Sequence, residues 1–312
     1  MLQQYSVQNG KIEQGVNGYP LIDIYIRPDE SERRHLVDDC DIDEHTLLSS
    51  NDPDETPRVE IEDNHTAVIL KYPKNYSAED NFFFRVKSMG VFLFPAEQRI
   101  VIVVDDQIPL FTGRLMTLKT PQDVLLRILS QTIRHFETHL RIINMCSDEL
   151  EHEINKPSGN KNQLDMFTLK KGLVYYTNAL TGNQAVIDRL MRSASRIGFT
   201  EENREILEDQ VIENHQFLAQ ARVYSEILTQ LMATHESIIN NNLNEMMKKM
   251  NAIVIAVSIP TFLTGVGGMS EFSAVLTDRK IHWAVGYPVF FGVMILLAYL
   301  IYWLIQRHYN SH

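Results

Sequence analysis

Two long apolar runs near the C-terminal end constrain this 312-residue chain more than any other feature. Residues 250–269 contain no charged side chain, and residues 283–305 form a longer and more apolar run. About 20 apolar residues are enough for an α-helix to cross the hydrocarbon core of a bilayer. The flanking residues are those typical of membrane interfaces: Lys248, Lys249, Trp283, Tyr287, Tyr302 and Trp303. We therefore expect two transmembrane helices, at 250–269 and 283–305, rather than two core helices of a soluble domain.

The short connection between the two runs predicts a helical hairpin. Residues 270–282 are expected to form a periplasmic loop, so that the tail at 306–312 returns to the side on which the chain entered. The first residues lack the basic, apolar and cleavage segments of a secretory signal, and the two cysteines have no C-x-x-C spacing. We expect both termini in the cytoplasm and the chain in a bacterial inner (plasma) membrane.

The N-terminal part has the pattern of a soluble α/β domain, expected over residues 1–119. Short runs rich in β-branched and aromatic residues alternate with turn-forming residues, and the clearest predicted strands are 19–26, 59–72, 82–94 and 100–104. Residues 120–249 instead predict helices. The whole chain is therefore expected to be an α+β membrane protein.

Capping residues mark the starts of the long helices. Thr120, Pro121 and Asp123 form a variant of the capping box, and Thr200 precedes two glutamates. A second helix is expected at about 163–195, after the Pro-Ser-Gly break at 157–159. After Thr200 no Pro or Gly occurs before Pro260, so one stalk helix from about residue 201 is expected to continue into the first membrane span.

Composition favours cations over nucleic acids as ligands. The formal net charge is −11, whereas nucleic-acid binding needs clustered Lys and Arg. Two apolar helices cannot enclose a hydrated path, so a pore requires a homo-oligomer within the lipid bilayer. The first span has the more polar face, with candidate pore-lining residues at helical spacing: Asn244, Met247, Met250, Asn251, Ser258 and Thr261. The alternative is that its small hydroxyl residues pack between helices.

Two motifs at the ends of this segment resemble those of a known family. The sequence PTFLTGVGGMSEF at 260–272 is similar to the signature of the CorA family of magnesium transporters and of its ZntB zinc-transporting branch, in which the first membrane helix ends in Gly-Met-Asn. Upstream, NEMMKK at 244–249 resembles the family's Asn-Glu-x-Met-Lys-Arg stretch, at the family's distance. The resemblance also leaves open that the chain belongs to a CmaX-like branch of the family.

The resemblance implies a funnel-shaped homopentamer that carries Mg²⁺, with Zn²⁺, Co²⁺ and Ni²⁺ as alternatives, either passively or coupled to protons. It implies that Asn244 lines the pore, that Met247 and Met250 form a hydrophobic gate, and that Ser258 and Thr261 lie deeper. The implied selectivity mouth is Gly268, Met269, Ser270 and Glu271. Ser270 stands where the family has asparagine, so its shorter side chain is expected to alter how the hydration shell of the ion is recognised.

Two other functions compete with transport. Ser270 and a tail without a basic cluster are compatible with a non-conducting, membrane-anchored scaffold or metal sensor. His135 and His139 share a helix face and suggest a zinc enzyme, although a packed helix surface is the simpler interpretation. No P-loop, nucleophile elbow or Cys-His cluster is present in the sequence, so we expect no enzyme and no cofactor beyond a transported or regulatory cation. The sequence does not identify metal ligands.

Overall fold

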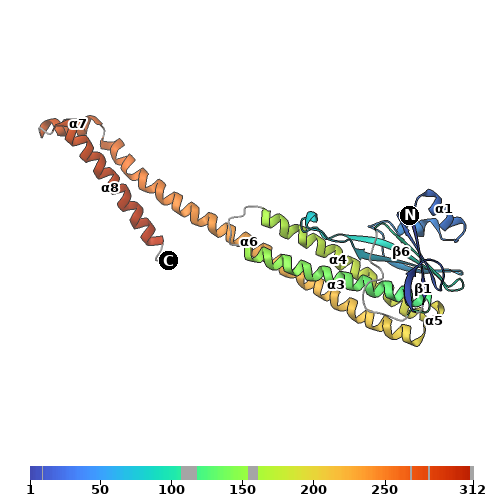
Figure 1. The fold of residues 1–312 in the computed structure, drawn as a ribbon. Helices are drawn as coiled ribbons and strands as arrows, with labels where there is room; N and C mark the ends of the chain where they lie inside the picture. The colour runs from blue at the N-terminus through green and yellow to red at the C-terminus, as the bar shows by residue number, and fades with distance from the viewer. Residues whose placement is uncertain (9, 107–117, 154–160, 268, 280–281, 310–312) are drawn as a thin grey trace. The chain divides into compact units, whose positions relative to one another are not determined.

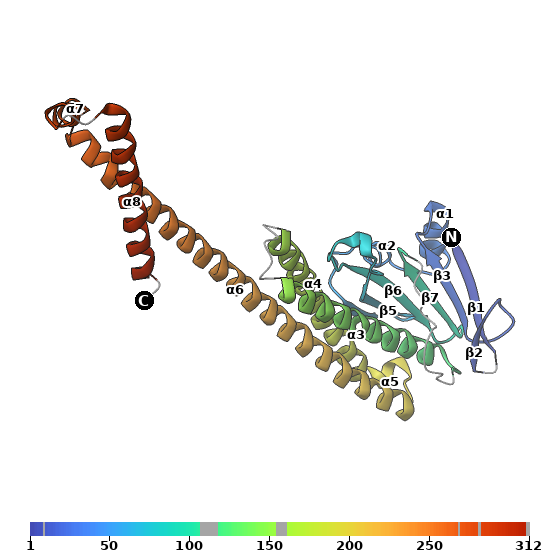
Figure 2. The same ribbon diagram turned by 60° about the vertical axis from the view of Figure 1, so that its left-hand side comes forward.

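The structure, a computed structural model, describes residues 1–8, 10–106, 118–153, 161–267, 269–279 and 282–309. The described residues form two compact units, Met1–Met232 and Ala233–His312. The first unit combines a β-sheet with helices, and the second contains two long helices and a short one (Figures 1 and 2). The predicted fold class, a soluble α/β region followed by a long helix and an apolar helical hairpin, is confirmed.

A mixed sheet of seven strands forms the centre of the first unit. The strands are β1 (Leu2–Gln8), β2 (Lys11–Gln14), β3 (Leu21–Ile26), β4 (Arg58–Ile61), β5 (Thr66–Pro73), β6 (Val86–Phe94) and β7 (Arg99–Val104). Their order is β2-β1-β3-β7-β6-β5-β4. Only β3 and β7 pair in parallel; the other neighbours are antiparallel.

Side chains of the central strands alternate between two cores. Val91 and Leu93 belong to the larger core, whereas the intervening Phe92 faces a smaller core on the other side of the sheet. This alternation follows from the two-residue period of a strand. Because both faces are covered, β5, β6 and β7 each contain a continuous apolar run, at 67–70, 89–94 and 100–104, respectively. The predicted run 59–72 is divided into β4 and β5 by a turn.

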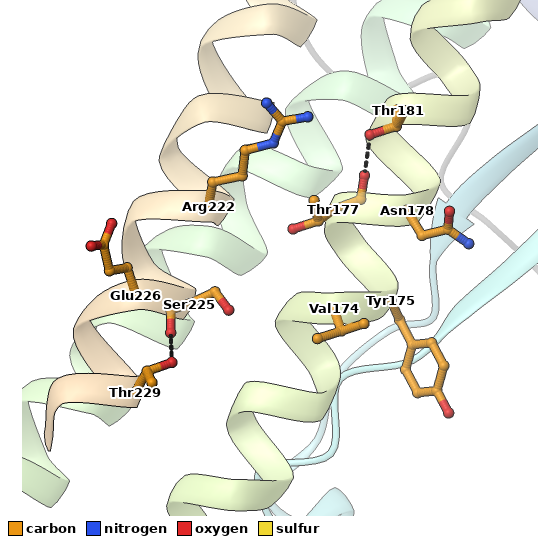
Figure 3. A pocket seen from close by; sticks show the side chains of 9 residues that line it. All are labelled: Val174, Tyr175, Thr177, Asn178, Thr181, Arg222, Ser225, Glu226 and Thr229. Carbon is orange, nitrogen blue, oxygen red and sulfur yellow. Dashed lines mark hydrogen bonds between the residues drawn. The ribbon is translucent and has the colours of Figure 1, made fainter. Parts of the chain in front are cut away.

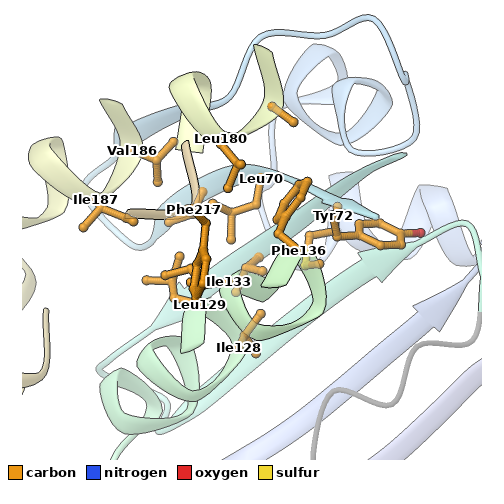
Figure 4. Close-up of a cluster of buried hydrophobic side chains, with 14 of the residues drawn as sticks. Leu70, Tyr72, Ile128, Leu129, Ile133, Phe136, Leu180, Val186, Ile187 and Phe217 are labelled. Atoms are coloured by element: carbon orange, nitrogen blue, oxygen red, sulfur yellow. The ribbon is translucent and has the colours of Figure 1, made fainter. Parts of the chain in front are cut away.

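Helices cover each face of the sheet. The smaller core lies under α1 (Glu30–Asp38) and α2 (Glu44–Ser49). The larger core lies between the sheet, α3 (Pro121–Glu153), α4 (Lys161–Arg192) and the first part of α6 (Glu201–Gly267). Figure 4 shows this larger core, in which Leu70, Phe136, Leu180 and Phe217 come from β5, α3, α4 and α6, respectively. A one-turn η1 (Ala78–Asp80) and α5 (Ala194–Ile197) complete the unit.

The predicted helix starts are confirmed by their capping hydrogen bonds. The Asp123 amide donates to Thr120 Oγ1 at 3.3 Å, and the Thr120 amide donates to Asp123 Oδ2 at 2.9 Å. At the start of α6, the amide of Asn203 donates to Thr200 Oγ1 at 3.2 Å. The predicted Pro-Ser-Gly break after α3 lies outside the described residues.

The second unit begins within α6 and continues through α7 (Met269–Asp278) and α8 (Trp283–Tyr309). The expectation of a loop throughout 270–282 is wrong, because α7 occupies most of that connection. Helix-forming residues such as Ala274 and Leu276 allow this short segment to satisfy its backbone groups internally. Leu276 also packs against Gly286, where an added Cβ would lie 2.5 Å from Leu276 Cδ2.

Candidate functional site: the polar face of the first membrane helix

The candidate site is the C-terminal half of α6, within the second unit. Both α6 and α8 contain stretches long and apolar enough to cross a membrane. In the most apolar stretch of α6, 17% of the residues are buried, and in that of α8 none is. The core helices of a soluble protein would be mostly buried, so these stretches favour two membrane-spanning helices.

One side of α6 is packed. Ala252 and Ala256 are 3% and 4% exposed, and Pro260 is also buried. These residues recur every fourth position and therefore form one stripe. Helix α8 runs beside this part of α6 in both views (Figures 1 and 2). The hydrogen bond from Lys249 to Glu245 raises the pKa of the lysine.

The predicted pore-lining residues lie on the other side of α6. At about 100° per residue, Met247 is about 180° from Ala256, the centre of the packed stripe, and Ser258 is about 160° from it. The remaining four are each about 120–140° from Ala256 by the same geometry: Asn244, Met250, Asn251 and Thr261. All six side chains are exposed in the isolated chain. The structure thus brings the predicted residues to a single face, which we call the α6 polar face.

Sequence reasoning missed Asn240, a further polar member of the α6 polar face. Asn240 is exposed and lies about 160° from Ala256. The sequence signal for Asn240 was its position four residues before Asn244, because residues four positions apart share a side of a helix. The two asparagines extend the polar face by one turn toward the N-terminal end of α6.

Two hydroxyl groups of this face donate their protons to the helix backbone. Ser258 Oγ donates its proton to the carbonyl of Val254 at 2.7 Å, and Thr261 Oγ1 donates to that of Val257 at 2.8 Å. With that proton committed, each oxygen presents lone pairs outward. Water molecules around a cation point their oxygens inward and their hydrogens outward, so they require acceptors of this kind.

The predicted mouth is only partly described. Gly268 lies outside the described residues. Met269, Ser270 and Glu271 form the first turn of α7, and the structure does not describe their side chains. The geometry of the mouth therefore stays a prediction.

The histidine pair of α3 belongs to the core of the first unit. His139 is 4% exposed, and its Nδ1 lies 2.6 Å from the hydroxyl of Tyr176 on α4. Burial, together with the neighbouring His135, lowers the pKa of His139 to about 3. Over the described ranges, no three His, Cys, Asp or Glu side chains are grouped as metal ligands. This arrangement favours packing over a zinc site.

A shallow pocket of about 720 Å³ lies between α4 and α6 in the first unit (Figure 3). Thr181 and Thr229 on its walls direct their hydroxyls to the carbonyls of Thr177 and Ser225. Glu226 is the only carboxylate that lines this pocket. Because divalent cations such as Ca²⁺ and Mg²⁺ prefer several oxygen ligands, the pocket is a poor cation site.

These observations define a chain with two candidate membrane spans, an α/β unit and one polar face on the first of the two candidate spans. Residues 23–307 match the family model described as "CorA-like Mg2+ transporter protein". The chain belongs to this family of divalent cation transporters.

Individual relatives agree with this assignment. The cobalt/magnesium transport protein CorA of Methanocaldococcus jannaschii is 25% identical over 296 residues, covering 92% of this chain and 89% of the relative. The complete structure of that organism's CorA magnesium transporter matches with a TM-score of 0.77 and 19% identity, covering 98% of each chain. Full-length CmaX matches with a TM-score of 0.71 and 15% identity, covering 98% of this chain and 96% of CmaX. These two structural matches show a shared fold.

Proposed function

We propose that several copies of this chain form a pore through which hydrated divalent cations cross the membrane along the α6 polar face. Mg²⁺ and Co²⁺ are the first candidates, because the M. jannaschii relative is a cobalt/magnesium transport protein. The observation that carries the proposal is the placement of the predicted polar residues opposite the stripe that contains Ala252 and Ala256. A face left uncovered by α8 is available to surround a central path.

The chemistry of the α6 polar face suits ions that keep their water. Mg²⁺ dehydrates reluctantly, so a wall of hydroxyl and amide oxygens that accept hydrogen bonds from its hydration shell is favourable. Met247 and Met250 place apolar side chains beside these groups, where a narrow ring of them would exclude water and close the path. The net charge of −11 favours the approach of cations.

The assembly and orientation are part of the same proposal. One helical hairpin cannot enclose water, and the family resemblance supports five copies with α6 at the centre and α8 outside. The hairpin places both termini on one side, which we assign to the cytoplasm of a cell bounded by this membrane.

Uptake into liposomes tests the proposal. The purified full-length protein is reconstituted with an internal metal-sensitive dye, and protein-free liposomes serve as the control. We expect uptake of Mg²⁺ above that control, and Co²⁺, Ni²⁺ and Zn²⁺ are measured in parallel, with and without a pH gradient. Failure of all four ions to enter would refute transport.

Ser270 favours one alternative, a non-conducting membrane scaffold or sensor with the same fold. A ring of serines at the mouth would lack the amides that the family motif supplies. The Ser270→Asn variant separates the two functions in the same assay. Mg²⁺ uptake by Ser270→Asn, without uptake by the wild-type protein, would support the scaffold.

A further inference from the structure

The α6 polar face continues beyond Asn240 to a carboxylate, Glu236. Glu236 lies 11 residues before Met247, which corresponds to about 20° of rotation and roughly 16 Å along the helix. It is about 160° from Ala256, the same angular distance as Ser258. The Glu236 side chain is exposed. The preceding residue, His235, is 5% exposed, so α6 is packed on one side and open on the other at this level too.

The other charged residues in this part of α6 lie elsewhere on the helix. Besides His235 and Glu236, the segment 233–267 contains Glu245, Lys248 and Lys249. Glu245 and Lys249 are each about 20° from Ala256, and Lys248 is about 80° from it. Glu245 and Lys249 also pair with each other at 2.8 Å. The α6 polar face thus contains one negative charge and no positive charge over this segment.

We propose that Glu236 concentrates cations at the N-terminal end of the pore and makes it selective against anions. This inference rests on the proposed function, because it requires α6 to surround a path. One carboxylate from each copy then forms a ring about two turns below Asn244. Like charges held around a narrow opening add their potentials, which raises the local concentration of cations and lowers that of anions.

Salt dependence distinguishes this role from a structural one. An exposed carboxylate acts through the potential in the surrounding water, which extends about 30 Å at 0.01 M ionic strength and about 10 Å at 0.1 M. Neutralising Glu236 should therefore slow uptake most at low ionic strength. A variant that only disturbed packing would lower uptake equally at both.

The test uses full-length Glu236→Gln in dye-loaded liposomes, with Glu245→Gln as the matched control on the opposite side of the same helix. We expect Glu236→Gln to reduce the initial rate of Mg²⁺ uptake about tenfold at low ionic strength, the lower end of the effect of charge-lined clefts on encounter rates. The difference should shrink at high ionic strength. Glu245→Gln should match the wild-type protein, and Glu236→Lys should fall below Glu236→Gln.

Equal uptake by wild-type protein and Glu236→Gln at low ionic strength would overturn the inference, as would an equal loss in Glu245→Gln. A loss in Glu236→Gln that is independent of salt would also overturn it. Absence of uptake by the wild-type protein would refute the proposed function itself, so the two failures are distinguishable. Light scattering of each purified variant checks that the oligomer is unchanged.

Discussion

The side chain of Asn183 on α4 makes two hydrogen bonds with β5 of the kind that a neighbouring strand would make. The pairing of β4 with β5 begins at Ile69, so the outer edge of β5 at Lys71 has no strand partner. The amide of Lys71 donates to Asn183 Oδ1 at 2.9 Å, and Asn183 Nδ2 donates to the Lys71 carbonyl at 2.7 Å. Asn183 is 2% exposed, so water cannot readily take over these bonds.

We expect Asn183→Ala to destabilise the protein substantially. It leaves one backbone donor and one backbone acceptor buried without partners, and each costs about 1–3 kcal/mol. The sum is about 2–6 kcal/mol. For a unit of this size, each kcal/mol lowers Tm by about 2–4 °C, so the expected decrease is roughly 5–20 °C.

Thermal unfolding of the detergent-solubilised full chain, followed by circular dichroism, measures this effect. Asn178→Ala is the matched control, because Asn178 lies on the same helix and is exposed. It should change the free energy of unfolding by no more than about 0.5 kcal/mol. If Asn183→Ala unfolded at the same temperature as Asn178→Ala, the amide would not stabilise the strand edge and the reasoning would be wrong.

Two further predictions concern the first unit. Folding lowers the pKa of His139 from 6.5 to about 3. As the pH falls below 6.5, the unfolded chain therefore binds a proton at His139 before the folded chain does. The folded state keeps its full stability above pH 6.5 and loses free energy of unfolding as the pH falls toward 3. His139→Gln should therefore reduce the slope of unfolding free energy against pH by up to about 1.4 kcal/mol per unit in that window, measured by denaturant titration; an unchanged slope would contradict the assignment. Gly182→Ala places a Cβ 2.6 Å from Cγ of the rigid Pro57 ring, whereas an alanine at Gly292 meets nothing within 4 Å. Gly182→Ala should lower the free energy of unfolding by about 1–3 kcal/mol, and Gly292→Ala should leave it unchanged. Equal melting curves for the two variants would contradict this prediction.

The long helices and the two spans could be predicted because their causes are local. Caps at Thr120 and Thr200 lie within three residues of the amides that they satisfy, and an apolar run of 20 residues is visible in any window. The α6 polar face was predicted for the same reason, since residues three and four positions apart share a side of a helix. Its role in conduction stays a prediction.

Long-range features were not predictable in this way. Asn183 and Lys71 are 112 residues apart, and only the folded sheet shows that β5 lacks a partner there. Which side of α6 is covered by α8 is likewise known only from the tertiary structure. From the sequence alone, Glu236 cannot be distinguished from other solvent-exposed glutamates. Helix α7 was predicted as loop because its ten residues lie between two strong apolar runs and carry no clear cap.

Cysteine accessibility tests the central claim that the α6 polar face, rather than the packed stripe, lines the cation path. Ser258→Cys and Ala256→Cys are made in a chain whose native cysteines, Cys40 and Cys146, are alanine. Each is treated in liposomes with a small cationic thiol reagent, and Mg²⁺ uptake is measured before and after. The account predicts rapid labelling and loss of uptake at Ser258→Cys, with neither at Ala256→Cys. Labelling and block at Ala256→Cys, with Ser258→Cys unreactive, would contradict it.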